Sequence, residues 1–286
     1  MVATTIEGGL GNQLFMYAAA RALSLRLQTG LVLNTRLGFI DDWFHRNYEL
    51  QEFDITYKES RFLTFDYRGG NRLKNLSRRF GRNVLLPNYL YFCDKTLNKG
   101  IDERFFEVET KDIYIEGYWQ SEKYFEDYKS VLKDDLRFDN LKKSEILKCE
   151  ETELLSLTDK IPVCLCIRRY QECVKTPSFG VLDSSFYLNA MDMIASKLNK
   201  PPIFYVFTQD IGWALQNVCQ NRHYSYKLVQ EKRSVEDLYL MSLFHYHIIS
   251  NSTFYWWGAW LADSEIVVSN RLFCNKNSNL GRWLVV

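Results

Sequence analysis

The opening of the chain constrains the fold most, because a short apolar run leads through a glycine-rich turn into an amphipathic helix. Residues 2–6 are typical of a β-strand, and residues 8–13, Gly-Gly-Leu-Gly-Asn-Gln, follow as a tight turn. Apolar side chains recur at helical spacing over residues 14–23, and residues 31–34 are typical of a second strand. This order of elements predicts a doubly wound α/β domain.

The second half of the chain repeats the alternation of strands and helices. Apolar runs predict strands at 161–168, 203–208, 247–250 and 266–268, and helical periodicity predicts helices at 184–199, 211–218, 235–245 and 253–262. Such alternation indicates a second parallel sheet. A polar stretch at 141–158, rich in Lys and Glu, is interpreted as a linker that contains the domain boundary. The prediction is two domains, residues 1–145 and 146–286.

Composition narrows the class of protein. The 286 residues are 47% hydrophobic and 25% charged, with a net charge of +1, so no overall field attracts nucleic acid or anionic membrane. We find no secretory signal and no apolar run of the roughly 20 residues that span a bilayer. Seven cysteines without a Cys-X-X-Cys motif argue against a disulfide framework and a zinc site. The four histidines show no metal-ligand spacing, so we expect a protein without a metal ion. Its expected location is the cytoplasm.

Two adjacent arginines, Arg168 and Arg169, end the apolar run at 161–167. The guanidinium group stays protonated, and its fork of donors matches two phosphate oxygens, so this position suits a pyrophosphate. Taken alone, an Arg-Arg pair is more often a pair of solvated surface charges.

Three further positions suit an anionic ligand, and each has a structural alternative. Backbone N–H groups at Gly9, Gly11 and Asn12 lie where a helix begins, although glycines also serve close packing of a strand against a helix. Residues 250–253, Ser-Asn-Ser-Thr, precede an aromatic helix and form either an anion cradle or an ordinary N-cap. Asp210 follows a predicted strand and either contacts a ligand or caps the next helix.

In their order along the chain, these motifs resemble the inverting α1,2-fucosyltransferases of glycosyltransferase family eleven, which use GDP-fucose. The resemblance covers almost the whole chain. It rests on GGLGNQLFMYA at 8–18, GYWQS at 117–121 followed by KYF at 123–125, IRR at 167–169, VFTQD at 206–210 and ISNSTFYWWGAWL at 249–261. It implies a GT-B-like α/β fold, in which two Rossmann-like domains face each other across a cleft. Residues 146–286 would bind GDP-fucose, and residues 1–145 would form the acceptor side.

The resemblance also implies roles for individual residues. Arg168 would hold the β-phosphate and stabilise the charge on departing GDP, while Arg169 would hold the loop. The remaining predicted donor-binding residues are Gly9, Gly11 and Asn12 at the first turn, Asp210 facing guanine or ribose, and Asn251, Ser252 and Thr253 at the phosphates.

The chain departs from the family pattern beside the arginines. The family pattern is His-X-Arg-Arg-Gly-Asp-Tyr, in which the His helps to contact guanine, whereas Cys166 and Gln171 stand at the His and Asp positions here. Without that Asp, the candidates for a catalytic acid or base are Glu172 and Glu7.

The function predicted from the sequence is metal-independent transfer of L-fucose from GDP-fucose to the 2-hydroxyl of a terminal β-galactose on a glycan. Two alternatives stay open: a GT-B transferase that uses another nucleotide sugar, and a glycan-binding protein with a degenerate donor site. The sequence leaves open the acceptor, the general base, the oligomeric state and a peripheral position at the inner membrane face.

Overall fold

The chain forms two compact α/β units, each built on a fully parallel sheet. The computed structural model describes residues 1–40, 42, 44–59, 89–96, 100–169, 181–220, 223–270 and 281–285. The units are Met1–Asn140 and Leu141–Val286, so the division falls five residues before the boundary placed from the sequence. The prediction of an α/β fold with two parallel sheets is confirmed.

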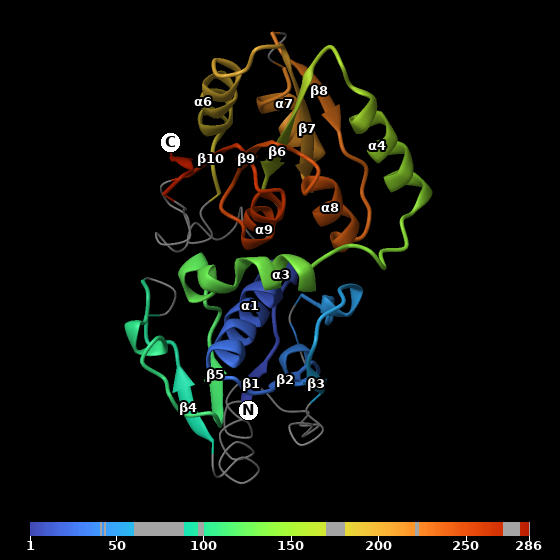
Figure 1. The fold of residues 1–286 in the computed structure, drawn as a ribbon. Helices are drawn as coiled ribbons and strands as arrows, with labels where there is room; N and C mark the ends of the chain where they lie inside the picture. Colours follow the sequence, from blue (N-terminus) through green and yellow to red (C-terminus); the bar gives the residue numbers. More distant parts are fainter. Residues whose placement is uncertain are drawn as a thin grey trace. The chain divides into compact units, whose positions relative to one another are not determined.

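Unit 1 has one five-stranded sheet in the order β3-β2-β1-β5-β4, and Figure 1 shows α1 lying across it. Its elements are β1 (Val2–Thr5), α1 (Leu10–Arg26), β2 (Leu31–Asn34), β3 (Lys58–Glu59), β4 (Leu90–Cys93), β5 (Ile113–Glu116) and α3 (Lys129–Asp135). Because β1 pairs with both β2 and β5 in parallel register, the carboxyl ends of these central strands meet at one edge. The glycine-rich turn that follows β1 therefore lies at the edge where open α/β sheets bind ligands.

The helix α1 is buried along most of its length, and one carboxylate joins it to α3. The Asp135 carboxylate accepts hydrogen bonds from the Tyr17 hydroxyl at 2.7 Å and from Arg21 Nε at 2.9 Å. Arg21 lies off the apolar stripe predicted from the sequence, so the stripe faces the sheet while Arg21 pairs with α3. This buried pair fixes the orientation of α1 and hence of its first turn.

Gly38 lies against the end of β1, immediately before the glycine turn. A Cβ atom added there would lie 2.0 Å from the Ile6 carbonyl oxygen and 2.6 Å from the Glu7 Cβ. Only glycine fits, because the nearest atom belongs to backbone that cannot rotate away.

We expect Gly38→Ala to lower the free energy of unfolding by about 2 kcal/mol, because the added methyl group forces backbone apart. Gly281→Ala is the matched control, since no heavy atom of the described residues lies within 4 Å of its added Cβ. Urea denaturation of both variants measures the effect. Equal stability of the two variants would contradict the packing of Gly38 against β1.

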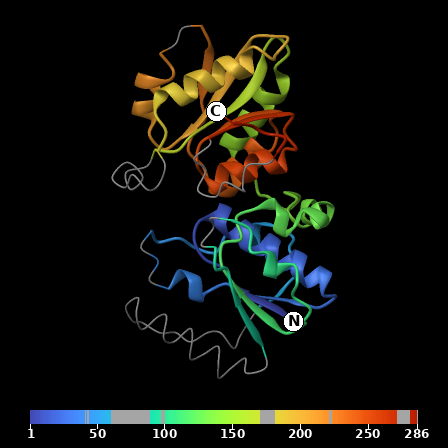
Figure 2. The ribbon, with the colours of Figure 1, turned by 90° about the vertical axis from the view of Figure 1, so that its left-hand side faces the viewer.

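Unit 2 has a six-stranded sheet in the order β11-β10-β9-β6-β7-β8. Figure 2 shows α6 in yellow and α9 in red packed against this sheet. Its elements are α4 (Glu145–Ser156), β6 (Ile161–Ile167), α6 (Ser184–Ala195), β7 (Pro202–Thr208), α7 (Ile211–Asn217), β8 (Ser225–Leu228), α8 (Ser234–Met241), β9 (Tyr246–Ile249), α9 (Thr253–Leu261), β10 (Ile266–Ser269) and β11 (Leu284–Val285).

The central strand β6 is buried on both faces, as its continuous apolar sequence predicts. Alternate residues, from Val163 to Ile167, pack with α6 in the main hydrophobic core. On the other face the Sγ atoms of Cys164 and Cys166 are 3.5 Å apart, and Cys166 Sγ is 3.8 Å from Met241 Sδ on α8. Both cysteines are therefore small buried thiols that pack in the core of unit 2.

The polar stretch at 141–158 is a packed helix of unit 2, not a linker. Glu150 on α4 is buried and forms an ion pair with Lys232, with 2.6 Å between the Lys232 Nζ and Glu150 Oε2 atoms. Asp237 on α8 lies 3.2 Å from the same Nζ atom. The interpretation as a linker is wrong, because the Lys232 ammonium pairs with the carboxylates of both Glu150 and Asp237 and so joins α4 to α8.

We expect Asp237→Asn to gain stability relative to the wild type as pH rises from 5 to 8, by about 1 kcal/mol. Burial raises the pKa of Asp237 to about 6, above its value in an unfolded chain. The folded protein therefore holds this proton more tightly, and wild-type stability falls as pH rises through 6. Urea denaturation at both pH values measures the difference, and a pH-independent difference would contradict the prediction.

The strands predicted from apolar runs are present, while β3, β4, β8 and β11 were missed. β4 lies in a stretch whose periodicity is weak, and β8 is a half-buried edge strand with polar residues. Ser121 caps a 3-10 turn at Glu122–Tyr124, and the α-helix α3 begins only at Lys129. Among the described residues, no helix combines the length and apolar composition that crossing a bilayer requires.

Candidate active site

Arg168 follows β6 directly and is held by the segment that follows β9. Its backbone N–H donates to Ser250 Oγ at 3.0 Å, and its guanidinium donates to the Asn251 carbonyl oxygen at 2.5 Å. Ser250 N–H donates in turn to the Cys166 carbonyl, so the parallel pairing of β6 and β9 continues one step beyond the strands. The structure thus brings together Arg168 and the 250–253 segment, which the sequence placed in one site.

Two buried tyrosines support this junction from opposite sides of the sheet. The Tyr255 hydroxyl on α9 donates to the Ile167 carbonyl at 3.5 Å. Tyr187 on α6 is fully buried and packs with Ile167 in the main hydrophobic core, and burial raises its pKa. Sequence analysis missed Tyr187, although its place on the buried stripe of α6 marked it as a core residue facing the sheet.

The 250–253 segment carries the chain into α9. Ser250 and Asn251 are buried, whereas Ser252 and Thr253 are partly exposed at the start of the helix. Within the described residues, the Ser252 side chain makes no capping hydrogen bond to α9, although Ser252 holds the N-cap position. The three tryptophans of α9, Trp256, Trp257 and Trp260, are fully buried and belong to the core of unit 2.

Arg169 turns away from Arg168 and packs beside α7. Its guanidinium carbon lies 4.1 Å from the centre of the Trp213 ring, and its Nε is 4.0 Å from Asp210 Oδ2. Asp210 Oδ1 accepts the Trp213 backbone N–H at 3.0 Å and so caps α7. Of the two interpretations of Asp210, the structure shows the helix cap, while contact with a nucleotide stays a prediction.

We expect Asp210→Ala to lower the free energy of unfolding by about 1 kcal/mol, because α7 loses its N-cap. Asp210→Asn keeps a capping oxygen and is expected to stay within about 0.5 kcal/mol of the wild type. Thermal and urea unfolding of both variants provide the measurement. Equal losses in the two variants would show that the charge facing Arg169, not the cap, matters for stability.

In unit 1 the glycine turn is built by α1 and two other segments. Gly8 has a φ of +79°, the left-handed conformation that favours glycine, and Gly9 is the N-cap of α1. The fully buried Gln13 side chain donates from Nε2 to the carbonyl oxygens of Gly8 and Asn47, both at 2.9 Å. Its Oε1 accepts the Glu49 N–H, so a single side chain joins the turn to residues 47–49.

Asn12 and Arg46 lie at the same turn. Asn12 Oδ1 accepts a hydrogen bond from Gln120 Nε2 at 3.0 Å, and Gln120 belongs to the segment that follows β5. An added Cβ at Gly9 would lie 4.0 Å from Arg46 Nε, and the Arg46 guanidinium lies 4.2 Å from the Phe44 ring centre. Sequence analysis missed Arg46, because it lies in a stretch without readable periodicity, and missed Gln120 as a partner of Asn12.

Some predicted site features receive no structural test. Glu172 and Gln171 lie outside the described residues. Glu7 is half-buried beside the glycine turn. His247 is fully buried, and both of its ring nitrogens have protein partners: Ser264 Oγ lies 2.7 Å from Nδ1, and the Met241 carbonyl oxygen lies 3.0 Å from Nε2. In the ranges that the structure describes, no group of three or more His, Cys, Asp or Glu side chains could hold a metal ion.

Comparison with protein families gives one match that covers nearly the whole chain. The model of Glycosyl transferase family 11 matches residues 1–277. An alpha-1,2-colitosyltransferase of Escherichia coli is 26% identical over 285 residues, which cover 94% of this chain and 90% of that protein. The O-antigen biosynthesis glycosyltransferase WbnK of Escherichia coli is 28% identical over 297 residues, covering 93% and 92%.

Solved structures share the fold at low sequence identity. An alpha-1,6-fucosyltransferase, NodZ, soaked with GDP-fucose aligns with a TM-score of 0.52 at 15% identity, over 91% of both chains. A mutant of Arabidopsis thaliana FUT1 in complex with GDP aligns with a TM-score of 0.55 at 13% identity, over 92% of this chain and 68% of that one. The two-unit parallel architecture is therefore that of these GT-B-like fucosyltransferases.

Proposed function

Because this chain belongs to glycosyltransferase family 11, we propose that it transfers L-fucose from GDP-fucose to the 2-hydroxyl of a terminal β-galactose on a glycan. The transfer inverts the anomeric centre and needs no metal ion. We place the reaction in the cytoplasm, including the inner membrane face. A relative named for O-antigen biosynthesis suggests a growing polysaccharide as the acceptor.

The observation that carries this proposal is the position of Arg168 at the end of β6. Its guanidinium is fixed by the Asn251 carbonyl, and its backbone is fixed by Ser250. A cation held rigidly at the carboxyl end of a parallel strand, beside a helix that begins with Ser252 and Thr253, suits a diphosphate. These groups match the chemistry of a nucleoside diphosphate leaving group.

The charge that develops during transfer explains why a fixed cation is needed. As the anomeric C–O bond breaks, positive charge builds on the sugar ring, as in glycoside cleavage, and negative charge builds on the departing GDP. A guanidinium near the β-phosphate stabilises this transition state more than the ground state, and so raises the rate. The acceptor hydroxyl attacks the opposite face of the ring and loses its proton.

Unit 1 has donors of its own at the start of α1. Asn12 and the backbone N–H groups near Gly9 and Gly11 stand at the positive end of α1, where an anionic group of the substrate is favoured. Arg46 adds positive charge at the same helix end. In unit 2, Arg169 packs on the Trp213 ring, and its Nε lies 4.0 Å from Asp210 Oδ2.

A colitosyl donor is the second candidate, and the colitosyltransferase relative favours it. Colitose is the 3-deoxy form of L-fucose, so the two donors differ by one hydroxyl group. A site built to hydrogen-bond the 3-hydroxyl rejects the deoxy sugar strongly, whereas an apolar contact at that position discriminates weakly. The ratio of kcat/KM for the two donors therefore decides between them.

The test is a product assay with GDP-fucose, GDP-colitose, GDP-mannose and UDP-galactose, each with a panel of β-galactosides. The proposal expects an α1,2-fucosyl product from GDP-fucose, formed in the presence of EDTA. Transfer from GDP-colitose alone would establish the second candidate. An α1,3 product, or hydrolysis without transfer, would overturn the proposed linkage or activity.

We expect Arg168→Ala to lower kcat with GDP-fucose by about 10²- to 10³-fold, because the charge on departing GDP loses its fixed cation. Arg168→Lys keeps the charge but loses the fork of donors, so an intermediate loss is expected. Steady-state kinetics measure both variants, and glycan binding is measured in parallel. If the wild type binds glycan but shows no turnover, and Arg168→Ala binds glycan equally well, the chain is a binding protein with a degenerate donor site.

A further inference from the structure

We propose that Gln120 is a positioning residue of the transfer reaction, which fixes the orientation of the Asn12 carboxamide so that its N–H donors face the glycine turn. The inference rests on the proposed function, in which Asn12 acts on an anionic substrate group. Gln120 Nε2 donates to Asn12 Oδ1 at 3.0 Å. The opposite end of the carboxamide faces the turn, since an added Cβ at Gly8 would lie 3.1 Å from Asn12 Nδ2.

The orientation matters because an amide group has a donor end and an acceptor end. An anion at the start of α1 is stabilised by N–H groups and repelled by a carbonyl oxygen. If the Asn12 carboxamide turned over, Oδ1 would face the Gly8 turn in place of Nδ2. With Gln120 Nε2 facing Asn12, as in the structure, the observed orientation is favoured, because this donor has to meet an acceptor on Asn12.

The segment that carries Gln120 has an unusual backbone. Gly117 has a φ of +148° and Trp119 a φ of +51°, a conformation that a large side chain rarely adopts. Trp119 is fully buried against Phe92, with ring centres 5.7 Å apart, and against Phe105 at 5.1 Å. Such strain persists only where packing enforces it, and it occurs mainly at functional sites. Here it directs the chain after β5 so that Gln120 reaches α1.

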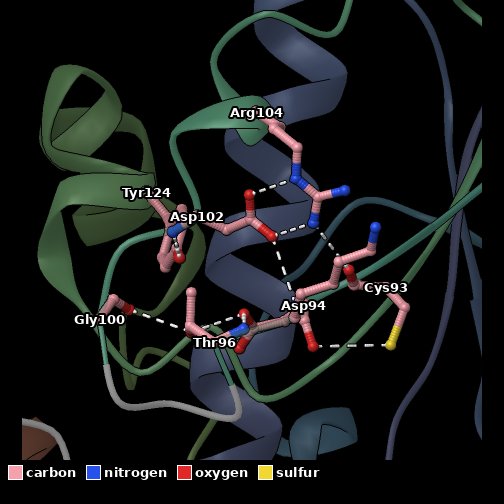
Figure 3. A network of polar contacts seen from close by, with 8 residues as sticks. Cys93, Asp94, Thr96, Gly100, Asp102, Arg104 and Tyr124 are labelled. Atoms are coloured by element: carbon pink, nitrogen blue, oxygen red, sulfur yellow. Dashed lines mark hydrogen bonds and ion pairs between the residues drawn. The ribbon is translucent and has the colours of Figure 1, made fainter.

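A polar network braces this segment from the side of β4 (Figure 3). The Arg104 guanidinium binds both oxygens of the buried Asp102 carboxylate, and the Asp102 N–H donates to the Tyr124 hydroxyl at 2.8 Å. Asp94 accepts both the N–H and the hydroxyl of Thr96.

This network leaves no space at Gly117. An added Cβ at Gly117 would lie 2.8 Å from the Asp94 Cβ, so the network packs directly behind the turn that leads to Gln120. Gln120 itself is 7% exposed, whereas Asn12 is half-buried. Gln120 is therefore held more firmly by its surroundings than Asn12, and Asn12 takes its orientation from Gln120.

The decisive variant is Gln120→Glu, which keeps the size of the side chain but replaces its donor by a carboxylate. Asn12 then meets an acceptor, so its carboxamide turns over and presents Oδ1 to the glycine turn. We expect kcat to fall about 100-fold at pH 8, comparable with the loss of one fixed donor, with a smaller change in KM. The melting temperature separates this effect from a loss of folding.

A pH profile distinguishes positioning from a general structural role. When the introduced carboxyl group is protonated it regains an O–H donor, and burial beside an amide raises its pKa. We therefore expect the ratio of Gln120→Glu to wild-type kcat to rise as pH falls from 8 to 5.5. Gln120→Met, which only removes the donor, is expected to show a smaller and pH-independent loss. Gln220→Glu, at an exposed position in unit 2, controls for added charge.

A double-mutant cycle completes the test. In an Asn12→Ala background, Gln120→Glu is expected to change kcat by less than twofold, because its effect passes through Asn12. Two results with an active wild type would overturn the role of Gln120 and leave the proposed function intact. The first is that the kcat losses of Asn12→Ala and Gln120→Glu add in the double variant. The second is that the ratio of Gln120→Glu to wild-type kcat does not change with pH. A wild type that transfers no sugar from any of the four donors would overturn both.

Discussion

The parallel pairing of β6 with β9 is the constraint on which the candidate donor site depends. Their register places the end of β6 beside the end of β9, and the Ser250 N–H continues the ladder to the Cys166 carbonyl. One residue further, the Ser250 hydroxyl accepts the Arg168 N–H. Arg168 and the start of α9, which are far apart in the sequence, are therefore fixed to each other by sheet register rather than by loop conformation.

Much of the architecture could be predicted because buried parallel strands have a clear signal. A run such as residues 161–167 is apolar throughout, and the polar residues that follow it mark the carboxyl edge. That rule placed Arg168 and residues 250–253 at strand ends, and the resemblance to the family joined them in one predicted site. β8 was missed because all four of its residues are only partly buried, so the apolar signal is weak.

The misinterpreted and missed features depend on partners that are distant in the sequence. The Lys- and Glu-rich composition of α4 is typical of a solvated segment, but Glu150 is buried because Lys232 reaches it from beyond β8. Gln13 and Gln120 are ordinary polar residues in isolation. Their roles arise from hydrogen bonds to residues 47–49 and to Asn12, which local patterns do not predict. Asp210 shows the reverse case, because its position between a strand and a helix already made the cap on α7 one of its two predicted roles.

The replacement of histidine by Cys166 has a definite structural consequence. Residue 166 points to the face of the sheet covered by α8, where its thiol packs against Cys164 and Met241. Met241 in turn fills the space beside Gly258, where an added Cβ would lie 3.0 Å from the Met241 Cβ. A thiol is a weak hydrogen-bond donor, and this one is fully buried. In the proposed function, recognition of the donor's base would therefore fall to groups other than the side chain of residue 166, while the backbone at this position holds Ser250 and, through it, Arg168.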